Sequence, residues 1–270
     1  MANIELGIIG GGVMAEAILS RLLSVSLYQP VQVMVSEPVL DRRNFLRDRY
    51  QIQVTADNTT LISSSRVVLL AIKPQILPQL AAEFGTHSGA PPELVLSILA
   101  GINLEQLAEV FPHSSLIRAM PNTPATVGAG MTAIASSASV SPTHKRQAAA
   151  IFQAIGEVVE VPESLMDAVT GLSGSGPGFI AIAIEALTDG GVAAGLPRAI
   201  AAKLALATVW GTAELLRQSG LHPAQLKDQV TSPGGTTIAG IAALEQSGFR
   251  SALIRAVQAA SDRSKQLGQG

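Results

Sequence analysis

The chain has 270 residues, no cysteine, and 18 basic against 20 acidic residues, which leaves a formal net charge of -2 at neutral pH. The lack of cysteine excludes disulfides, zinc–thiolate sites, iron–sulfur clusters and thiol nucleophiles. The near-neutral charge lacks the positive field that a nucleic-acid or anionic-membrane partner would need. The four histidines show no metal-ligand spacing, so we predict no metal site.

The apolar content of the chain points to a subunit of an oligomer. Hydrophobic residues make up 47% of the chain and charged residues only 14%, so we expect a second subunit to cover part of the apolar surface. The opening MANIELGIIGGG lacks the basic start of a secretory signal, and there is no run of about 18 uncharged apolar residues that would predict a membrane span. We therefore expect a cytoplasmic protein.

In the first 160 residues, short apolar runs alternate with helical patterns. Strands are predicted at 5–9, 31–36, 66–72, 94–99 and 116–120, with weaker ones at 131–135 and 158–161. The helices predicted between them lie at 14–24, 39–50, 76–83, 104–110 and 143–155. This alternation predicts βαβ units and a mostly parallel sheet.

After Pro162 the strand pattern ends. Helices are predicted at 163–170, 177–195, 197–219, 222–230, 236–246 and 249–267, separated by Gly and Pro. The predicted fold is therefore α/β, with an N-terminal Rossmann-like doubly wound sheet over residues 1–162 and an all-α domain over residues 163–270. The first is interpreted as a dinucleotide-binding domain and the second as a dimerisation and substrate-binding domain.

The first predicted strand leads into GGGVMA, residues 10–15, and then into a helix. This is G-x-G-x-x-A in the strand–turn–helix context that dinucleotide binding needs. Gly10 permits the tight turn, Gly12 lets a pyrophosphate approach the backbone, and Ala15 allows close packing of helix and strand. The alternative is a glycine-rich turn with a structural role only.

The end of the second predicted strand reads SEP, residues 36–38, where the adenosine ribose would lie. Ser36, Arg42 and Arg43 would suit a 2′-phosphate. Glu37 would repel a phosphate if it points inward and would suit a bare 2′-hydroxyl instead. The two arginines are also compatible with a solvated helix face, so the sequence leaves the choice between NADPH and NADH open.

Later strands end in short motifs at the same predicted edge. AIKP covers residues 71–74, LSILAG covers 96–101, and RAMPNTPATVG covers 118–128. Ligands of open α/β sheets bind at the carboxyl ends of the strands, so these loops predict a cleft.

With these segments in view, the chain resembles the pyrroline-5-carboxylate reductases. The resemblance spans nearly the whole length through IGGGVMAEAI, AIKP, MPNTP, DAVTGLSGSGPGF, DGGVAAGLPR and QLKDQVTSPGGTTIAGI, in that order. It implies an oxidoreductase of proline biosynthesis that reduces the C=N bond of 1-pyrroline-5-carboxylate to L-proline. It also implies NADP(H) as cofactor, with NAD(H) as an option, and a helical domain that pairs two subunits into a homodimer, sometimes assembled further into a decamer.

The resemblance also implies site residues. Around the cofactor it places Ile9, Gly10, Gly11, Gly12, Val13, Met14, Ser36, Glu37, Asn58, Ala71, Ile72, Lys73, Pro74, Ile98, Leu99, Ala100 and Asn122. Around the substrate it places Ser175, Gly176, Gln229, Gly234, Gly235, Thr236 and Thr237, with Thr237 as the catalytic candidate. The chain departs from the family pattern twice: Glu37 stands where a small or neutral residue is common, and Gln229 stands where some relatives carry Asn.

The chemistry of imine reduction explains why so few acids and bases are predicted. A protonated imine is already electrophilic, and the hydride comes from the cofactor. The protein has to orient the two and grip a small carboxylate, which backbone amides at Gly-rich helix starts can do. GLSGSGPG and SPGGTT each precede a predicted helix, and Thr237 adds a hydroxyl that could bond the ring nitrogen. Either segment could instead be a plain turn.

Two other functions compete with this interpretation. A 3-hydroxyacid dehydrogenase would carry G-x-x-G-x-G-x-x-x-K-x-x-x-N at the domain junction, but Ile180 and Ile184 occupy the Lys and Asn positions and cannot act as a base. A nucleotide-sensing or lipid-associated binding protein could keep the fold and lose turnover, although the intact SPGGTT favours an enzyme.

Overall fold

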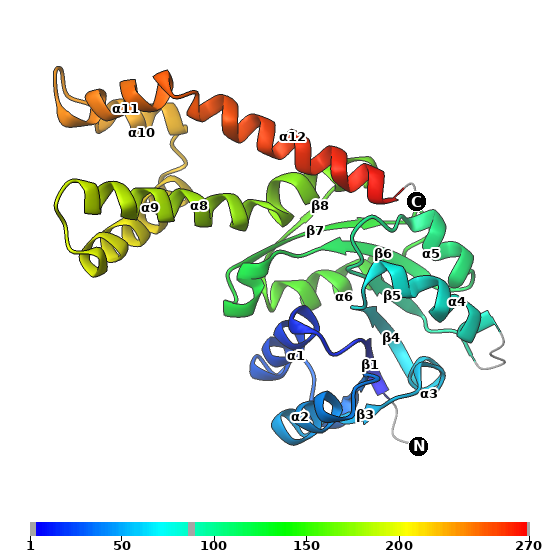
Figure 1. The fold of residues 1–270 in the computed structure, drawn as a ribbon. Helices are drawn as coiled ribbons and strands as arrows, with labels where there is room; N and C mark the ends of the chain where they lie inside the picture. The colour runs from blue at the N-terminus through cyan, green and yellow to red at the C-terminus, as the bar shows by residue number, and fades with distance from the viewer. Residues whose placement is uncertain (1–3, 86–89, 269–270) are drawn as a thin grey trace. The chain divides into compact units, whose positions relative to one another are not determined.

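The computed structural model describes residues 4–85 and 90–268, which fall into two compact units (Figure 1). The first unit runs to Ser175 and includes the chain from Ala260 onward, and the second covers Gly176–Ala259. The functional division after residue 162 stays a prediction.

The first unit is built on one eight-stranded sheet within the described chain, in the order β3-β2-β1-β4-β5-β6-β7-β8. Its neighbouring strands are parallel except for the antiparallel pair β6 and β7. The predicted Rossmann-like sheet is thereby confirmed. The strands are β1 (Ile4–Ile9), β2 (Val33–Ser36), β3 (Gln53–Thr55), β4 (Ser65–Leu70), β5 (Leu94–Ser97), β6 (Ser115–Met120), β7 (Gly130–Ser136) and β8 (Gly156–Glu160).

Helices cover both faces of this sheet (Figure 1). Buried side chains of α1, α2 and α6 pack in one core cluster, and those of α3, α4 and α5 pack in another on the opposite face. A third small cluster joins β7 to α7. The helices of this unit are α1 (Val13–Ser24), α2 (Leu40–Tyr50), α3 (Asn58–Ser64), α4 (Leu77–Gly85), α5 (Leu104–Val110), α6 (Pro142–Gln153) and α7 (Met166–Val169).

Two elements, β3 and α3, were not predicted from the sequence. β3 has only three residues and none of them is fully buried, so it has no apolar pattern to detect. α3 begins after Asp57, whose carboxylate accepts the amides of Thr59 and Thr60. This N-cap is the sequence signal that could have revealed the helix.

The second unit is helical, as predicted. It contains α8 (Gly176–Ala193), α9 (Arg198–Ser219), α10 (Pro223–Gln229), α11 (Thr236–Gln246) and the first part of α12 (Phe249–Gly268). α8 and α9 pack closely through small residues, because a Cβ at Gly191 would lie 3.0 Å from the Cβ of Ala201. Few residues of these helices are buried, and most of those are small, so this unit has little core of its own. The buried residues are Thr188, Ala201, Ala205 and Leu226.

The segment TGLSGSGPG is not the open turn that its glycines suggest. Residues Thr170–Gly174 form a π-helical turn that continues α7 toward α8, and the Ser175 amide donates to the Thr170 carbonyl at 2.9 Å. The Ser175 amide is therefore not one of the free donors expected from this segment, because it is engaged in a helical hydrogen bond.

Among the described helices, α9 is long and apolar enough to cross a membrane by length and composition, and 11% of its most apolar stretch is buried. The sequence expectation considered only uncharged runs, and α9 contains Lys203 and Glu214. The same length and composition also fit a helix whose apolar side is covered by another protein chain.

A partly buried ion pair connects the segment after β8 to the sheet. Arg118 in β6 has a side chain that is 7% exposed, and its guanidinium lies 3.5 Å from the carboxylate of Glu163. The same carboxylate accepts the amide of Leu104 at 2.6 Å and so caps the start of α5. Glu163 therefore joins β6, α5 and the approach to α7.

We expect Glu163→Ala to lower the free energy of unfolding by about 2 kcal/mol, because it leaves the Arg118 charge and the Leu104 amide without an acceptor. Glu163→Gln keeps an oxygen for the Leu104 amide and should lose less. Urea denaturation followed by circular dichroism, at one protein concentration, measures both. Parent-like stability of the alanine variant would show that water replaces the carboxylate without cost.

Candidate functional site

The glycine-rich turn lies where β1, β2 and β4 end side by side. The Gly10 amide donates to the Ser36 carbonyl at 2.8 Å, and the Ala71 amide donates to the Ile9 carbonyl at 2.9 Å. Gly10 has a φ of +99°, and a Cβ there would lie 2.7 Å from the Ala71 carbonyl oxygen. A side chain is therefore excluded at Gly10 by both conformation and space.

Gly12, in contrast to Gly10, has free space around it. It is the N-cap of α1 with φ −70° and ψ −176°, it has no side-chain cap, and no atom lies within 4 Å of an added Cβ. The amides of the first turn of α1 have no intrahelical partner and carry the positive end of the helix dipole. A bare N-terminus beside an open glycine fits the pyrophosphate of a dinucleotide.

A cavity of about 840 Å³ opens beside this turn. Ten residues predicted at the cofactor line it: Ile9, Gly10, Gly11, Gly12, Ser36, Glu37, Asn58, Ala71, Ile72 and Lys73. Val13 and Met14 begin α1 and lie outside this lining, as do Pro74, Ile98, Leu99, Ala100 and Asn122. Pro38, from the SEP segment predicted at the ribose, also lines it. The sequence did not predict the other lining residues: Val39, Ala56, Asp57, Thr59, Ile76, Gln79 and Glu83.

Glu37 points toward the glycine-rich turn. One carboxylate oxygen accepts the Gly11 amide at 2.9 Å, and the other accepts the Val39 amide at 3.0 Å. Two backbone donors thus fix a negative charge at the end of β2, where the sequence left its direction open.

The two nearby arginines support the turn. Arg42 donates to the Gly11 carbonyl at 2.6 Å and pairs with Glu16 at 2.5 Å. Arg43 donates to the carbonyls of Glu37 and Pro38 at 2.6 and 2.7 Å. The interpretation of both arginines as solvated surface residues is therefore wrong, since their guanidinium groups bind backbone oxygens around the site.

Glu16 joins α1 to α2 beneath the turn. It accepts from Arg42 and, at 2.8 Å, from the Tyr50 hydroxyl. Burial raises the pKa of the Glu16 carboxyl, but the hydrogen bonds from Arg42 and Tyr50 lower that pKa by more, so the net shift is downward. The carboxylate is therefore charged at neutral pH and keeps Arg42 in place.

A chain of polar side chains forms the next wall of the cavity. The Ser36 hydroxyl donates to Asn58 at 2.7 Å, and the Asn58 amide donates to Glu83 at 2.8 Å. Beside them, a hydrogen bond from the Thr60 hydroxyl lowers the pKa of Asp57. This wall carries negative charge.

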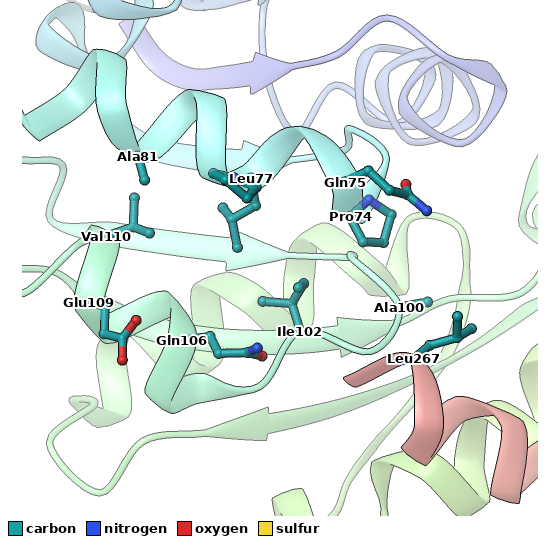
Figure 2. Close-up of a pocket in the computed structure, with 11 residues that line it drawn as sticks. Pro74, Gln75, Leu77, Ala81, Ala100, Ile102, Gln106, Glu109, Val110 and Leu267 are labelled. Atoms are coloured by element: carbon teal, nitrogen blue, oxygen red, sulfur yellow. The ribbon is translucent and has the colours of Figure 1, made fainter. Parts of the chain in front are cut away.

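A second cavity, of about 610 Å³, lies between α4, α5 and the end of α12 (Figure 2). Its lining is mostly apolar and includes Pro74 and Ala100, two residues predicted along the cofactor. Figure 2 shows Leu267 on the last turn of α12 beside Ala100. The Leu99 side chain is 2% exposed and belongs to the core, so only its backbone could meet a ligand.

Asn122 is engaged within the first unit. Its oxygen accepts the Met131 amide at 2.9 Å, and its nitrogen donates to the carbonyl and hydroxyl of Ser173 at 3.3 Å. The side chain thus holds the π-helical turn against the loop after β6. This positioning role was not anticipated from the motif MPNTP.

The predicted substrate loop lies in the second unit at the start of α11. Gly234 has a φ of +64°, and Gly235 is an N-cap without a side-chain cap. In the described part of the chain, neither the Thr236 nor the Thr237 hydroxyl has a hydrogen-bond partner. Free amides and hydroxyls at a helix start suit a small carboxylate. Gln229 is exposed at the end of α10.

Comparison with known proteins assigns the family. A family described as pyrroline-5-carboxylate reductase dimerisation matches residues 163–267, and one described as NADP oxidoreductase, coenzyme F420-dependent, matches residues 5–101. A pyrroline-5-carboxylate reductase from Synechocystis sp. is 60% identical over 267 residues, or 99% of each chain. The chain belongs to the pyrroline-5-carboxylate reductase family. The resemblance seen in the sequence is confirmed, and with it the enzyme class, an NAD(P)H-dependent oxidoreductase.

Solved structures agree with this assignment. The pyrroline-5-carboxylate reductase of Coxiella burnetii has a TM-score of 0.87 at 32% identity and covers 98% of both chains. The Plasmodium falciparum pyrroline carboxylate reductase, a crystal structure with NADP bound, has a TM-score of 0.86 at 30% identity and 99% coverage of both chains.

Among the described residues, no cluster of three His, Asp or Glu could hold a metal ion.

We expect Gly12→Val to weaken the binding of NADH and NADPH at least tenfold, because the new side chain fills the space beside the free amides of α1. The fold should survive, since nothing lies within 4 Å of the added Cβ. Gly10→Ala is the matched control and should instead lose stability. Calorimetric titration and urea denaturation measure both effects, and unchanged nucleotide affinity in folded Gly12→Val would contradict the prediction.

Proposed function

We propose that the chain reduces the C=N bond of 1-pyrroline-5-carboxylate to L-proline with NAD(P)H. The observation that carries this proposal is the pair of features described above, a dinucleotide-sized cavity at a glycine-rich turn and a second helix start with free threonine hydroxyls. Imine-dependent oxidation of reduced nicotinamide by the purified protein tests it directly.

The first unit would hold the cofactor. The amides at the start of α1 bind the pyrophosphate, Glu37 and Ser36 face the adenosine ribose, and Ala71–Pro74 and Ile98–Ala100 continue along the dinucleotide. The bound reduced cofactor supplies the hydride, so the chain needs no redox group of its own. The free amides at the start of α1 fit the pyrophosphate of this cofactor. Gly12 leaves space for it, because no protein atom lies within 4 Å of a Cβ added there.

The SPGGTT loop would hold the substrate. The amides of Thr236 and Thr237 point out of the first turn of α11 and bind the carboxylate, and the Thr237 hydroxyl bonds the ring nitrogen. Because the imine is protonated before reduction, the chain has to orient the ring and exclude water more than move protons. Ser175, Gly176, Gly234, Gly235 and Gln229 would complete the contacts, with Ser175 acting through its hydroxyl because its amide already bonds Thr170.

A homodimer accounts for the apolar surface of the second unit. Large side chains are exposed there, including Trp210 at 71% and Ile182 at 66%, while few residues are buried. An apolar surface of this kind is typical of a subunit interface. We propose the dimer on this basis and on the matching dimerisation family. A decamer, a cytoplasmic location and the lack of nucleic-acid or membrane partners are proposals of the same kind.

We expect Thr237→Ala to lower turnover tenfold to a hundredfold and to leave cofactor affinity unchanged, because one orienting hydrogen bond contributes about 1–3 kcal/mol. Thr237→Ser keeps the hydroxyl and should retain most of the activity. Steady-state kinetics with the cyclic imine, beside NAD(P)H titrations, measures both. If Thr237→Ala works at the parent rate and parent KM, the hydroxyl does not touch the substrate.

We expect Trp210→Glu to weaken the dimer, because it places a charge on a largely exposed apolar helix face. Sedimentation analysis across a concentration series measures the dissociation constant, and Trp210→Ala, which removes the apolar ring without adding a charge, separates the two effects. A parent chain that sediments as a monomer at micromolar concentration with full activity would refute the dimer.

A further inference from the structure

The backbone around Glu37 holds its negative charge near the expected position of the cofactor's 2′-oxygen, where NADH and NADPH differ. NADPH carries a phosphate on the 2′-oxygen of the adenosine ribose, and NADH carries a hydroxyl there. In dinucleotide-binding sheets this oxygen lies at the end of the second strand, where an acidic residue suits the hydroxyl and an arginine suits the phosphate. In this chain the residue after β2 is Glu37.

The direction of Glu37 is fixed by the backbone. Its two oxygens accept the amides of Gly11 and Val39, so the carboxylate faces the glycine-rich turn and lines the cavity. A carboxylate has about four acceptor positions, and two amides use only two of them. The remaining positions can accept a ribose hydroxyl, but they can only repel a phosphate.

The charged residues that line the cavity together with Glu37 are mostly acidic. Of the described residues that line the cavity, Glu37, Asp57 and Glu83 are acidic and Lys73 is the single base. Lys73 follows β4, which is two strands from β2, so their backbones are separated by about 10 Å at the usual strand spacing.

The nearest arginines are committed to other partners. Arg42 bonds the Gly11 carbonyl and Glu16, and Arg43 bonds the carbonyls of Glu37 and Pro38. Neither lines the cavity. Ser36, the remaining candidate for a phosphate, donates its hydroxyl to Asn58.

We propose that Glu37 selects the 2′-hydroxyl and makes this chain prefer NADH over NADPH. The proposal rests on the proposed imine reduction for its kinetic test, and on the cavity alone for its binding test. A relative at 30% identity binds NADP, so the preference belongs to the charges of this chain and not to the fold.

The kinetic test compares kcat/KM with NADH and with NADPH in the parent, in Glu37→Gln and in Glu37→Ser. We expect a parent ratio above one in favour of NADH, and a fall of at least tenfold in both variants. Asp41→Asn is the matched control, because it removes one exposed charge from the first turn of α2 outside the cavity, and its ratio should stay within twofold of the parent. A parent ratio below one, or an unchanged ratio in both Glu37 variants, overturns the proposal.

A binding test separates this proposal from the enzymatic one. Adenosine 5′-monophosphate and adenosine 2′,5′-bisphosphate differ only by the 2′-phosphate, and calorimetry measures both without any imine. We expect the parent to bind the monophosphate more tightly, and Glu37→Gln to reverse or abolish that order. Tighter binding of the bisphosphate by the parent overturns the proposal. Absence of imine reduction with both cofactors would defeat the proposed function and leave this test standing.

Discussion

The close approach of three strand ends at Gly10 determines the rest of the cofactor region. The Gly10 amide bonds the end of β2, and its α-carbon lies against the Ala71 carbonyl at the end of β4. With no side chain possible there, the chain turns at once into α1 and leaves a row of amides facing the cavity. Under the proposed function, recognition of the pyrophosphate at this site is therefore a property of the backbone, and titratable side chains only modify it.

Side chains outside the cavity stabilise the glycine-rich turn through hydrogen bonds. Arg42 and Glu16 form a charged pair with Tyr50 attached, and this group links the Gly11 carbonyl to α1 and α2. Arg42 is held by this support and does not line the cavity, whereas the carboxylate of Glu37 does. The hydrogen bonds that stabilise the turn thus also determine which charged side chains line the cavity.

The sequence predicted those features that depend on local pattern. The long apolar strands and the turn at Gly10 follow from burial and from steric demands that only glycine meets. It could not predict β3, which has three residues and is stabilised by pairing with β2. It could not orient Glu37 or Arg42, because long charged side chains choose among partners that the tertiary fold brings together. The glycines after Thr170 indicated a turn, whereas contacts such as those from Asn122 hold that segment as a π-helix.

The second unit adds a constraint of a different kind. Its helices bury little apolar surface within one chain, and residues such as Trp210 and Ile182 stay exposed. A helical unit with so small a core gains most of its stability from covering that surface. Under the proposed dimer, the loop that carries Thr236 and Thr237 belongs to the unit whose packing depends on the partner. Substrate binding and subunit association would then be thermodynamically linked, since a ligand that binds only the assembled form stabilises the assembly by mass action.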